Sequence, residues 1–456
     1  MSLSSLLSIA RTALVTQQRA IDTTGHNVAN AQTEGYSRQR LNIAPATPLQ
    51  LPFGQVGRGV NIDGIERVRS RFLDGNYRTA SGDLGNYSTR RELLGTVEGV
   101  FGEPSDTGLA TGLDDFFNAL DDLANEPTGK TQRTMVRTTA QNLVTRLHDT
   151  DSRINAVAAE TVTRMRDAVS EINRIAAQIA DLNVQVRAGN AGNRQSPDVQ
   201  DRRDLLVDEL SKYVGVRVLE RQDGTIGVTA GDVMIVDAGQ HTDLELRNLG
   251  DGAYSVGLVG SPGTVNLQTG QLAALAELSS TTLPGIRARL NGLVQGMVTE
   301  VNAIHRAGRN LTGATGIDFF DPTGLTASSV QLSQALQLTP DNIAAGRSGG
   351  SGDNANALAL AALRTNGVTS FGGQSIGEAY QALVSDLGVA VKDASQREEA
   401  QDVIANNADS QRKSVSGVSI DEELTQMIAQ QNAYSAAARL VSVADEMMQA
   451  VLGMVR

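Results

Sequence analysis

The stretch from Ile420 to Val455 carries the longest regular pattern of apolar positions in the chain. Apolar side chains recur there at alternating steps of four and three residues, interrupted only by Gln431 and Asp445. This pattern predicts a helix that packs lengthwise against other helices. A flanking row of small or apolar residues widens the stripe, which favours several neighbours over one. The stripe consists of Ile420, Leu424, Met427, Gln431, Tyr434, Ala438, Val441, Asp445, Met448, Leu452 and Val455, and the flanking row of Ala437, Ala444 and Val451.

The beginning of the chain repeats the pattern. The same spacing predicts a helix there of roughly 45 Å, against roughly 55 Å for the last one. Two such helices at opposite ends of a chain pair only if everything between them is looped out. The N-terminal stripe consists of Leu3, Leu7, Ala10, Leu14, Gln17, Ile21, Thr24, Val28 and Ala31.

The chain between the two ends alternates between helical and extended patterns. Helical periodicity is broken twice, and the first break carries strands of period two separated by Gly-containing turns. We therefore expect an α+β protein with long terminal coiled-coil helices and a central helical bundle that carries antiparallel, β-rich outer insertions. The expected domains are a terminal helical assembly domain (1–35 and 419–456), a strand and loop spacer (36–67), a helical bundle (68–213, 267–307 and 353–418) and a β-rich outer domain (214–266 and 308–352).

Composition narrows the class of protein. Hydrophobic residues make up 40% of the 456 positions but aromatics only 3%, so the cores must be aliphatic. A net charge of −12 argues against nucleic acid or an anionic membrane as a partner. The absence of cysteine suits a protein that is exported unfolded. Because neither a signal-peptide pattern nor a membrane-spanning apolar stretch is found, we expect a protein that is neither Sec-exported nor membrane-embedded.

No group of residues predicts catalysis. The four histidines lie in separate segments, and no His-Glu-x-x-His motif or phosphate-binding glycine loop is present. The aspartates of the segment 113–124 fit a solvated acidic face better than a metal site. We expect no enzyme, no cofactor and no bound metal.

The segment that follows the first predicted helix, Thr24 to Tyr36, contains an Asn-rich turn, an Ala-Asn-Ala triplet and a Gly-Tyr pair. Asn and Gly are residues of helix ends. In this order they resemble the N-terminal signature shared by the axial proteins of the bacterial flagellum. Two departures are visible: His26 stands where Asn is usual, and Glu34 where Pro or Ala is common.

The middle of the chain resembles the hook-associated members of that family. The resemblance lies in Ile172 to Gln185, in Asp201-Arg202-Arg203-Asp204-Leu205-Leu206, in Gly270-Gln271-Leu272 and in the pair Phe319-Phe320. Rod and hook proteins have mostly β middles, so the long predicted helices favour the hook-associated members. Flagellin has long helices, but its beginning does not resemble the segment from Asn27 to Tyr36.

The resemblance implies a structural subunit that joins hook to filament by helix-mediated axial polymerisation. It implies export through the flagellar type III channel, without a cleaved signal peptide, to the flagellum outside the cell. The implied partners are further copies of the chain in a ring or helical assembly, the hook protein, the next hook-associated junction protein and an export chaperone. A hook or rod subunit remains an alternative, as does a secreted helical adhesin or effector.

We expect the assembly interface to lie on the two terminal stripes and the signature between them, and the terminal helices to fold on assembly. The expected interface residues are Leu3, Leu7, Leu14, Ile21, Asn27, Val28, Asn30, Gly35, Tyr36, Ile420, Leu424, Met427, Tyr434, Val441, Met448, Leu452 and Val455.

Overall fold

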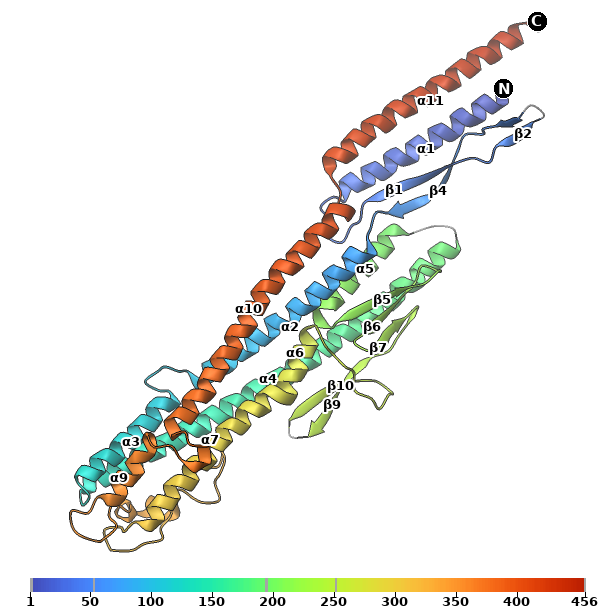
Figure 1. Ribbon diagram of the computed structural model, residues 1–456. Helices are drawn as coiled ribbons and strands as arrows, with labels where there is room; N and C mark the ends of the chain where they lie inside the picture. Colours follow the sequence, from blue (N-terminus) through green and yellow to red (C-terminus); the bar gives the residue numbers. More distant parts are fainter. Residues whose placement is uncertain (1–2, 52–53, 193–195, 251, 455–456) are drawn as a thin grey trace.

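The chain forms an elongated molecule with both termini at the same end (Figure 1). The structure is a computed structural model and describes all residues except 1–2, 52–53, 193–195, 251 and 455–456. Helix α1 (Leu3–Ala29) and helix α11 (Ile420–Met454) lie side by side at that end. The pairing of the two chain ends, expected from their matching patterns, is confirmed.

A narrow β-hairpin covers another side of α1. Strand β1 (Gln39–Pro45) pairs antiparallel with β4 (Val60–Arg67), and the short strands β2 (Leu49–Leu51) and β3 (Gly54–Val56) pair near the hairpin tip. Gly59 has a left-handed φ of +94°, and a Cβ atom there would overlap Oγ1 of Thr12. Glycine at this position therefore lets the hairpin approach the helix closely.

The rest of the molecule is built on long helices. Helix α2 (Arg71–Phe101) runs beside α10 (Ile376–Ser416), and the 62-residue α4 (Lys130–Ala191) leads into α5 (Pro197–Tyr213). Helices α3 (Leu109–Asn125) and α9 (Ala355–Ala361) close the end distant from the termini. The expected α+β class and its long helices are confirmed.

Helical structure continues past Pro284. Helix α6 (Gln271–Glu277) passes through a π-helical turn (Leu278–Thr282) into α7 (Leu283–Ala307). Proline lacks a backbone N–H and crowds the preceding turn, and the wider π turn accommodates it without ending the helix.

The segment after α5 forms the expected antiparallel sheets. Four strands pair in the order β5-β6-β7-β8, and β9 pairs with β10. The module is not separate from the bundle, because its buried side chains belong to the same apolar core as α4. Asn183 of α4 also bonds the backbone of Ile226 as a neighbouring strand would, through N–H and C=O at 3.0 and 2.8 Å. The strands are β5 (Val216–Glu220), β6 (Ile226–Ala230), β7 (Val233–Asp237), β8 (Gln240–His241), β9 (Leu244–Gly250) and β10 (Ala253–Leu258).

The segment 308–352 differs from the β-rich structure expected for it. Its described residues form helix α8 (Gln334–Leu338), a 3-10 turn (Pro340–Asn342) and isolated β-bridges, but no strand of a sheet. Phe319 and Phe320 are fully buried against Phe116. The side chain of Asn302 supplies the hydrogen bonds that a strand partner would, since it bonds both backbone groups of Phe320. The division of the chain into domains stays a prediction.

Candidate functional site

Helix α11 is covered along one narrow side only. Among the described elements, α1 alone packs extensively against it. The residues of α11 that face α1 recur every seven positions, and we call them the inner row: Glu423, Gln430, Ala437 and Ala444. Small side chains in this row allow the two helices to approach closely.

The seam is rotated relative to the stripe expected from the sequence. The expected stripe consists of two rows. The shared row lies next to the inner row on the helix surface, and the outer row lies on the other side of the shared row. Met427 and Val441 of the shared row are half-buried in the seam. The outer row points away from α1, so Leu424 is 45% and Leu452 63% exposed. The shared row is Ile420, Met427, Tyr434, Val441 and Met448, and the outer row is Leu424, Gln431, Ala438, Asp445 and Leu452.

Further apolar side chains widen this uncovered surface. Ile420, Tyr434 and Met448 of the shared row are exposed, as are Ile428, Leu440, Val443 and Met447 on other sides of the helix and Val451, one heptad beyond Ala444. Large apolar side chains exposed in such number along one helix mark a site of association with another macromolecule.

The expected interface residues of α1 are divided between two neighbours. Leu7, Leu14, Ile21 and Val28 are half-buried, because α1 lies between α11 and the β1–β4 hairpin. The side chain of Leu3 lies outside the part of the chain whose side chains are described, and Val455 lies outside the described residues.

The signature segment forms a joint between the terminal helices and the bundle. Asn27 is 2% exposed, and both the nitrogen and the oxygen of its side-chain amide make hydrogen bonds. Its Nδ2 donates to the backbone oxygen of Gln39 (2.9 Å) and to Oε2 of Glu423 (2.8 Å). Its Oδ1 accepts from the hydroxyl of Tyr36 (2.8 Å) and from the backbone N–H of Gln39 (2.9 Å). Asn27 thus holds α1, the hairpin and α11 together.

Two other signature residues shape the turn. The backbone N–H of Asn30 bonds to the oxygen of His26 (3.1 Å) where α1 ends. Gly35 has a φ of +78° and lies against Leu205, where a Cβ atom would come within 3.1 Å of that side chain. Both residues serve contacts within the chain.

The centre of the joint is an ion pair that the sequence did not predict. Glu423 is 1% exposed, and its Oε1 accepts from Nε of Arg38 at 2.7 Å. Arg38 also reaches Glu422 at 3.1 Å, and its backbone N–H donates to the oxygen of Ser416 at the end of α10. In the sequence, the only indication of this pair is that Glu423 occupies the same heptad position as Ala437 and Ala444.

On the side of the bundle, the joint contacts a row of carboxylates on α5. Arg67 donates to Asp201 (2.9 Å) and to Asp204 (2.7 Å). Burial alone raises the pKa of Asp204, but Arg67, Arg69 and Arg203 outweigh it and hold this pKa at about 2. The joint is therefore polar and ionic at neutral pH. Further along α5, Asp208 pairs with Arg78 of α2 and Arg412 of α10.

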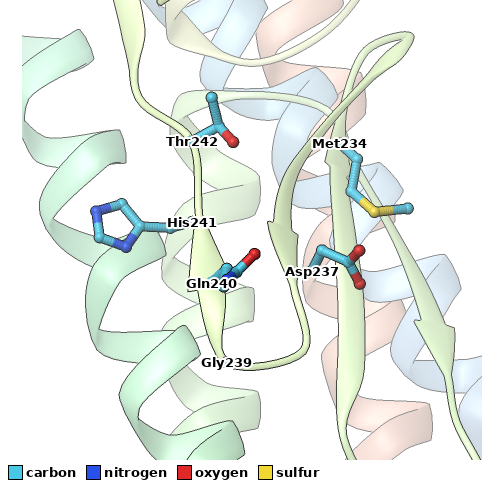
Figure 2. Close-up of a pocket in the computed structure, with 6 residues that line it drawn as sticks. All are labelled: Met234, Asp237, Gly239, Gln240, His241 and Thr242. Carbon is cyan, nitrogen blue, oxygen red and sulfur yellow. The ribbon is translucent and has the colours of Figure 1, made fainter.

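A hollow of about 630 Å³ at β7 and β8 does not bring reactive groups together (Figure 2). In it the imidazole of His241 points away from Asp237, whose carboxylate pairs with Arg221. Across the described residues, no group of three or more His, Cys, Asp or Glu side chains is placed to hold a metal ion. None of the described helices is long and apolar enough to cross a membrane.

Comparisons with known proteins match three parts of the chain to flagellar families. The model of the flagellar hook-associated protein FlgK helical domain matches residues 94–320. The flagella basal body rod protein model matches 7–36, and the flagellar basal body rod FlgEFG protein C-terminal model matches 411–454. The two rod-protein matches thus coincide with α1 and α11.

Curated relatives match nearly the whole chain. Flagellar hook-associated protein 1 of Bacillus subtilis (strain 168) is 29% identical over 98% of this chain and 97% of its own length. The protein of the same name from Escherichia coli (strain K12) is 25% identical over 99% of this chain and all of its own length. The solved flagellar hook junction protein FlgK from Burkholderia pseudomallei superposes with a TM-score of 0.67 at 17% identity, over 75% of this chain and 100% of that one, and so has the same fold.

The two terminal helices pair with each other and match rod proteins, and the middle of the chain matches a helical domain. Together these features define a structural subunit of the bacterial flagellum. Within that class, the near full-length matches and the helical-domain match show that the chain is similar to flagellar hook-associated protein 1 over nearly its whole length.

Proposed function

We propose that the chain forms the junction between flagellar hook and filament, as a ring or helical layer of identical subunits. The observation that carries the proposal is the uncovered apolar surface of α11, in a chain whose ends match axial rod proteins. Neighbouring subunits would cover that surface in the assembly. Burying each large apolar side chain then contributes roughly 1.5–3 kcal/mol before the cost of ordering.

The partners follow from this position. The hook protein lies on one side of the layer and the next hook-associated protein on the other. The residues predicted for the assembly interface divide accordingly: outer-row and exposed shared-row side chains face other subunits, while Asn27, Gly35 and Tyr36 hold the subunit's own joint together.

The route of assembly is part of the proposal. The chain leaves the cell unfolded through the flagellar export channel, with a chaperone holding its apolar terminal helices beforehand. The absence of cysteine supports this, because no wrong disulfide can form on the way. The structural role and the dispersed titratable side chains support a function without catalysis.

Electron microscopy of a strain that lacks the gene tests the proposal. The account predicts complete hooks without filaments, with flagellin released into the medium, and restoration by the wild-type gene. Loss of the hook itself would instead identify a hook or rod subunit. Normal flagella together with lost surface attachment would identify a secreted adhesin.

A further inference from the structure

The sequence contains two Asn-Gly pairs, which the fold places in different surroundings. Asn291-Gly292 lies within α7, and Asn366-Gly367 lies in the turn between α9 and α10. Asparagine followed by glycine is especially prone to deamidation, because glycine has no side chain to hinder the reaction. The reaction needs an asparagine side chain that can rotate and an unengaged N–H on the next residue. The two pairs differ in both respects.

The pair in α7 is held in place. Oδ1 of Asn291 accepts from the backbone N–H of Ala327 at 2.9 Å, which fixes the side chain. Gly292 lies well inside α7, where a backbone N–H donates to the carbonyl four residues earlier. Its nitrogen is therefore engaged in the helix and unavailable to the side chain of Asn291.

The pair in the turn is free to react. Asn366 and Gly367 are both exposed. Among the hydrogen bonds of the described residues, none involves the side chain of Asn366 or the backbone N–H of Gly367. The backbone N–H of Asn366 donates to the oxygen of Ala362 at 2.8 Å, which leaves the side-chain amide free to rotate. The amide carbon of Asn366 can thus approach the nitrogen of Gly367.

Close packing requires glycine at position 367. A Cβ atom there would overlap the backbone oxygen of Gly373, so any side chain would have to displace the turn. The turn is closed by two hydrogen bonds, from the N–H of Val368 to the oxygen of Gln374 (2.9 Å) and from the N–H of Gly373 to the oxygen of Val368 (3.0 Å). The fold thus keeps next to Asn366 the residue that exposes it most to attack.

We propose that Asn366 is a site of spontaneous deamidation through a cyclic imide. The backbone nitrogen of Gly367 attacks Cγ of Asn366, so that a bond forms between them and the bond from Cγ to Nδ2 breaks. Nδ2 leaves as ammonia, with the proton that the Gly367 nitrogen gives up. Water then opens the imide at Cγ, which yields aspartate, or at the main-chain carbonyl carbon, which yields isoaspartate.

Isoaspartate changes the turn because it places Cβ of residue 366 within the main chain. The inserted atom lies two residues before Val368, whose hydrogen bonds close the turn. Phe371 belongs to the same turn, and its ring packs directly on Gly296 of α7. We therefore expect the modification to loosen the connection between α9 and α10, at the end of the molecule distant from the termini (Figure 1).

Incubation of the purified full-length protein in mildly alkaline buffer, followed by tryptic digestion and mass spectrometry, tests the proposal. Cleavage after Arg364 and Lys392 gives a peptide in which Asn366 is the one asparagine. We expect Asn366 to convert at least tenfold faster than Asn291 in the folded protein, and the two to convert at similar rates in denaturant. Equal rates at the two sites of the folded protein, or an Asn366 that stays intact there, would overturn the proposal.

The products and their effect on the turn provide a second test. Imide opening yields isoaspartate together with aspartate, whereas aspartate alone would show direct hydrolysis and would refute the imide route. Hydrogen exchange of the Val368 and Gly373 amides should be faster in the converted protein than in fresh protein, and unchanged exchange would refute the effect on the turn. Asn366→Gln, whose longer side chain closes a less favourable ring, is the control and should remain unchanged. The terminal helices take no part, so the result is independent of the position of the protein in the flagellum.

Discussion

Nδ2 of Asn27 lies 2.8 Å from a carboxylate oxygen of Glu423, a residue 396 positions further along the chain. This contact joins the last turn of α1 to the first turn of α11. Since Arg38 binds the same carboxylate and the backbone of Ser416, the contact also links the terminal helices to the end of α10. The two ends of the chain are thus held together where they leave the bundle.

Replacing Glu423 by alanine should loosen this joint. The change leaves Arg38 and the amide of Asn27 without their partner, and a hydrogen bond to a charged group contributes about 1.5–3 kcal/mol. In the assembled protein, we expect limited proteolysis at residues 417–419 to accelerate roughly tenfold or more. Glu422→Ala, at an exposed carboxylate that also contacts Arg38, is the matched control and should change the rate little. Equal rates for the two variants would contradict the central role of Glu423.

The Asp204 carboxylate should be essential to the stability of the bundle end of the joint. Asp204→Asn removes the negative charge that Arg67, Arg69 and Arg203 surround, and breaking a buried ion pair costs about 3–5 kcal/mol. Urea unfolding of the variant measures this loss. The exposed pair of Asp386 with Arg289 supplies the control, Asp386→Asn, for which we expect less than about 1 kcal/mol.

The stability of the protein should fall on mild acidification because of His305. This imidazole is fully buried between the oxygen of Ile317 and the N–H of Ala344, and burial lowers its pKa from 6.5 to about 4. A depressed histidine pKa means that the unfolded chain binds the proton first. Stability is therefore fully present above pH 6.5 and is lost as the pH falls toward 4, by about 2 kcal/mol between pH 7 and 5.

Unfolding of a His305→Gln variant at pH 7 and pH 5 isolates this contribution. Its pH dependence should be flatter than that of the wild type by about 2 kcal/mol. His241→Gln, at an exposed position, should retain the wild-type pH dependence. A wild-type slope in the His305 variant would mean that another group causes the acid sensitivity.

Asn302 should anchor the segment 308–352 to the bundle. Its side chain bonds the N–H of Phe319 and both backbone groups of Phe320, and each buried group left unpaired costs about 1–3 kcal/mol. Asn302→Ala should lower the unfolding free energy by several kcal/mol and speed hydrogen exchange of the Phe319 and Phe320 amides. An exposed asparagine of α10, replaced as Asn406→Ala, should change neither quantity by a comparable amount.

The sequence predicted the long helices well because each has a regular apolar period over many turns. The 62 residues of α4 and the pairing of α1 with α11 follow from such patterns. The π turn before Pro284 could not be predicted from the sequence, because a proline usually ends a helix.

The segment 308–352 was misassigned for a different reason. Its glycines and short apolar runs are typical of strands and turns, but a side chain of α7 takes the place of the strand partner. Such a long-range contact leaves no local periodicity. The same holds for the β module, whose strands were expected but whose common core with α4 was not.

The candidate site was predicted in part. The apolar stripe of α11 and the importance of the segment from Asn27 to Tyr36 came from the pattern and from the resemblance. The row that faces α1 could not be chosen from periodicity, since two rows flank the shared one and the row with the larger apolar side chains, Leu424 and Leu452, is the one that is exposed. That choice depends on Arg38 and Asn27, which belong to segments far away in the sequence.

The central claim is that the outer row of α11 serves contacts between subunits and the inner row serves contact with α1. Aspartate introduced at Leu424 or at Ala437 separates the two roles, because one position is 45% and the other 5% exposed. In purified monomers, Leu424→Asp should keep the wild-type melting temperature and proteolytic pattern, whereas in the assembled protein Ala437→Asp should release the terminal helices to protease. In a strain that lacks the wild-type gene, Leu424→Asp should be secreted normally yet leave hooks without filaments. Filaments of normal number and length with Leu424→Asp, or a melting temperature lowered by several degrees in its monomer, would contradict the account.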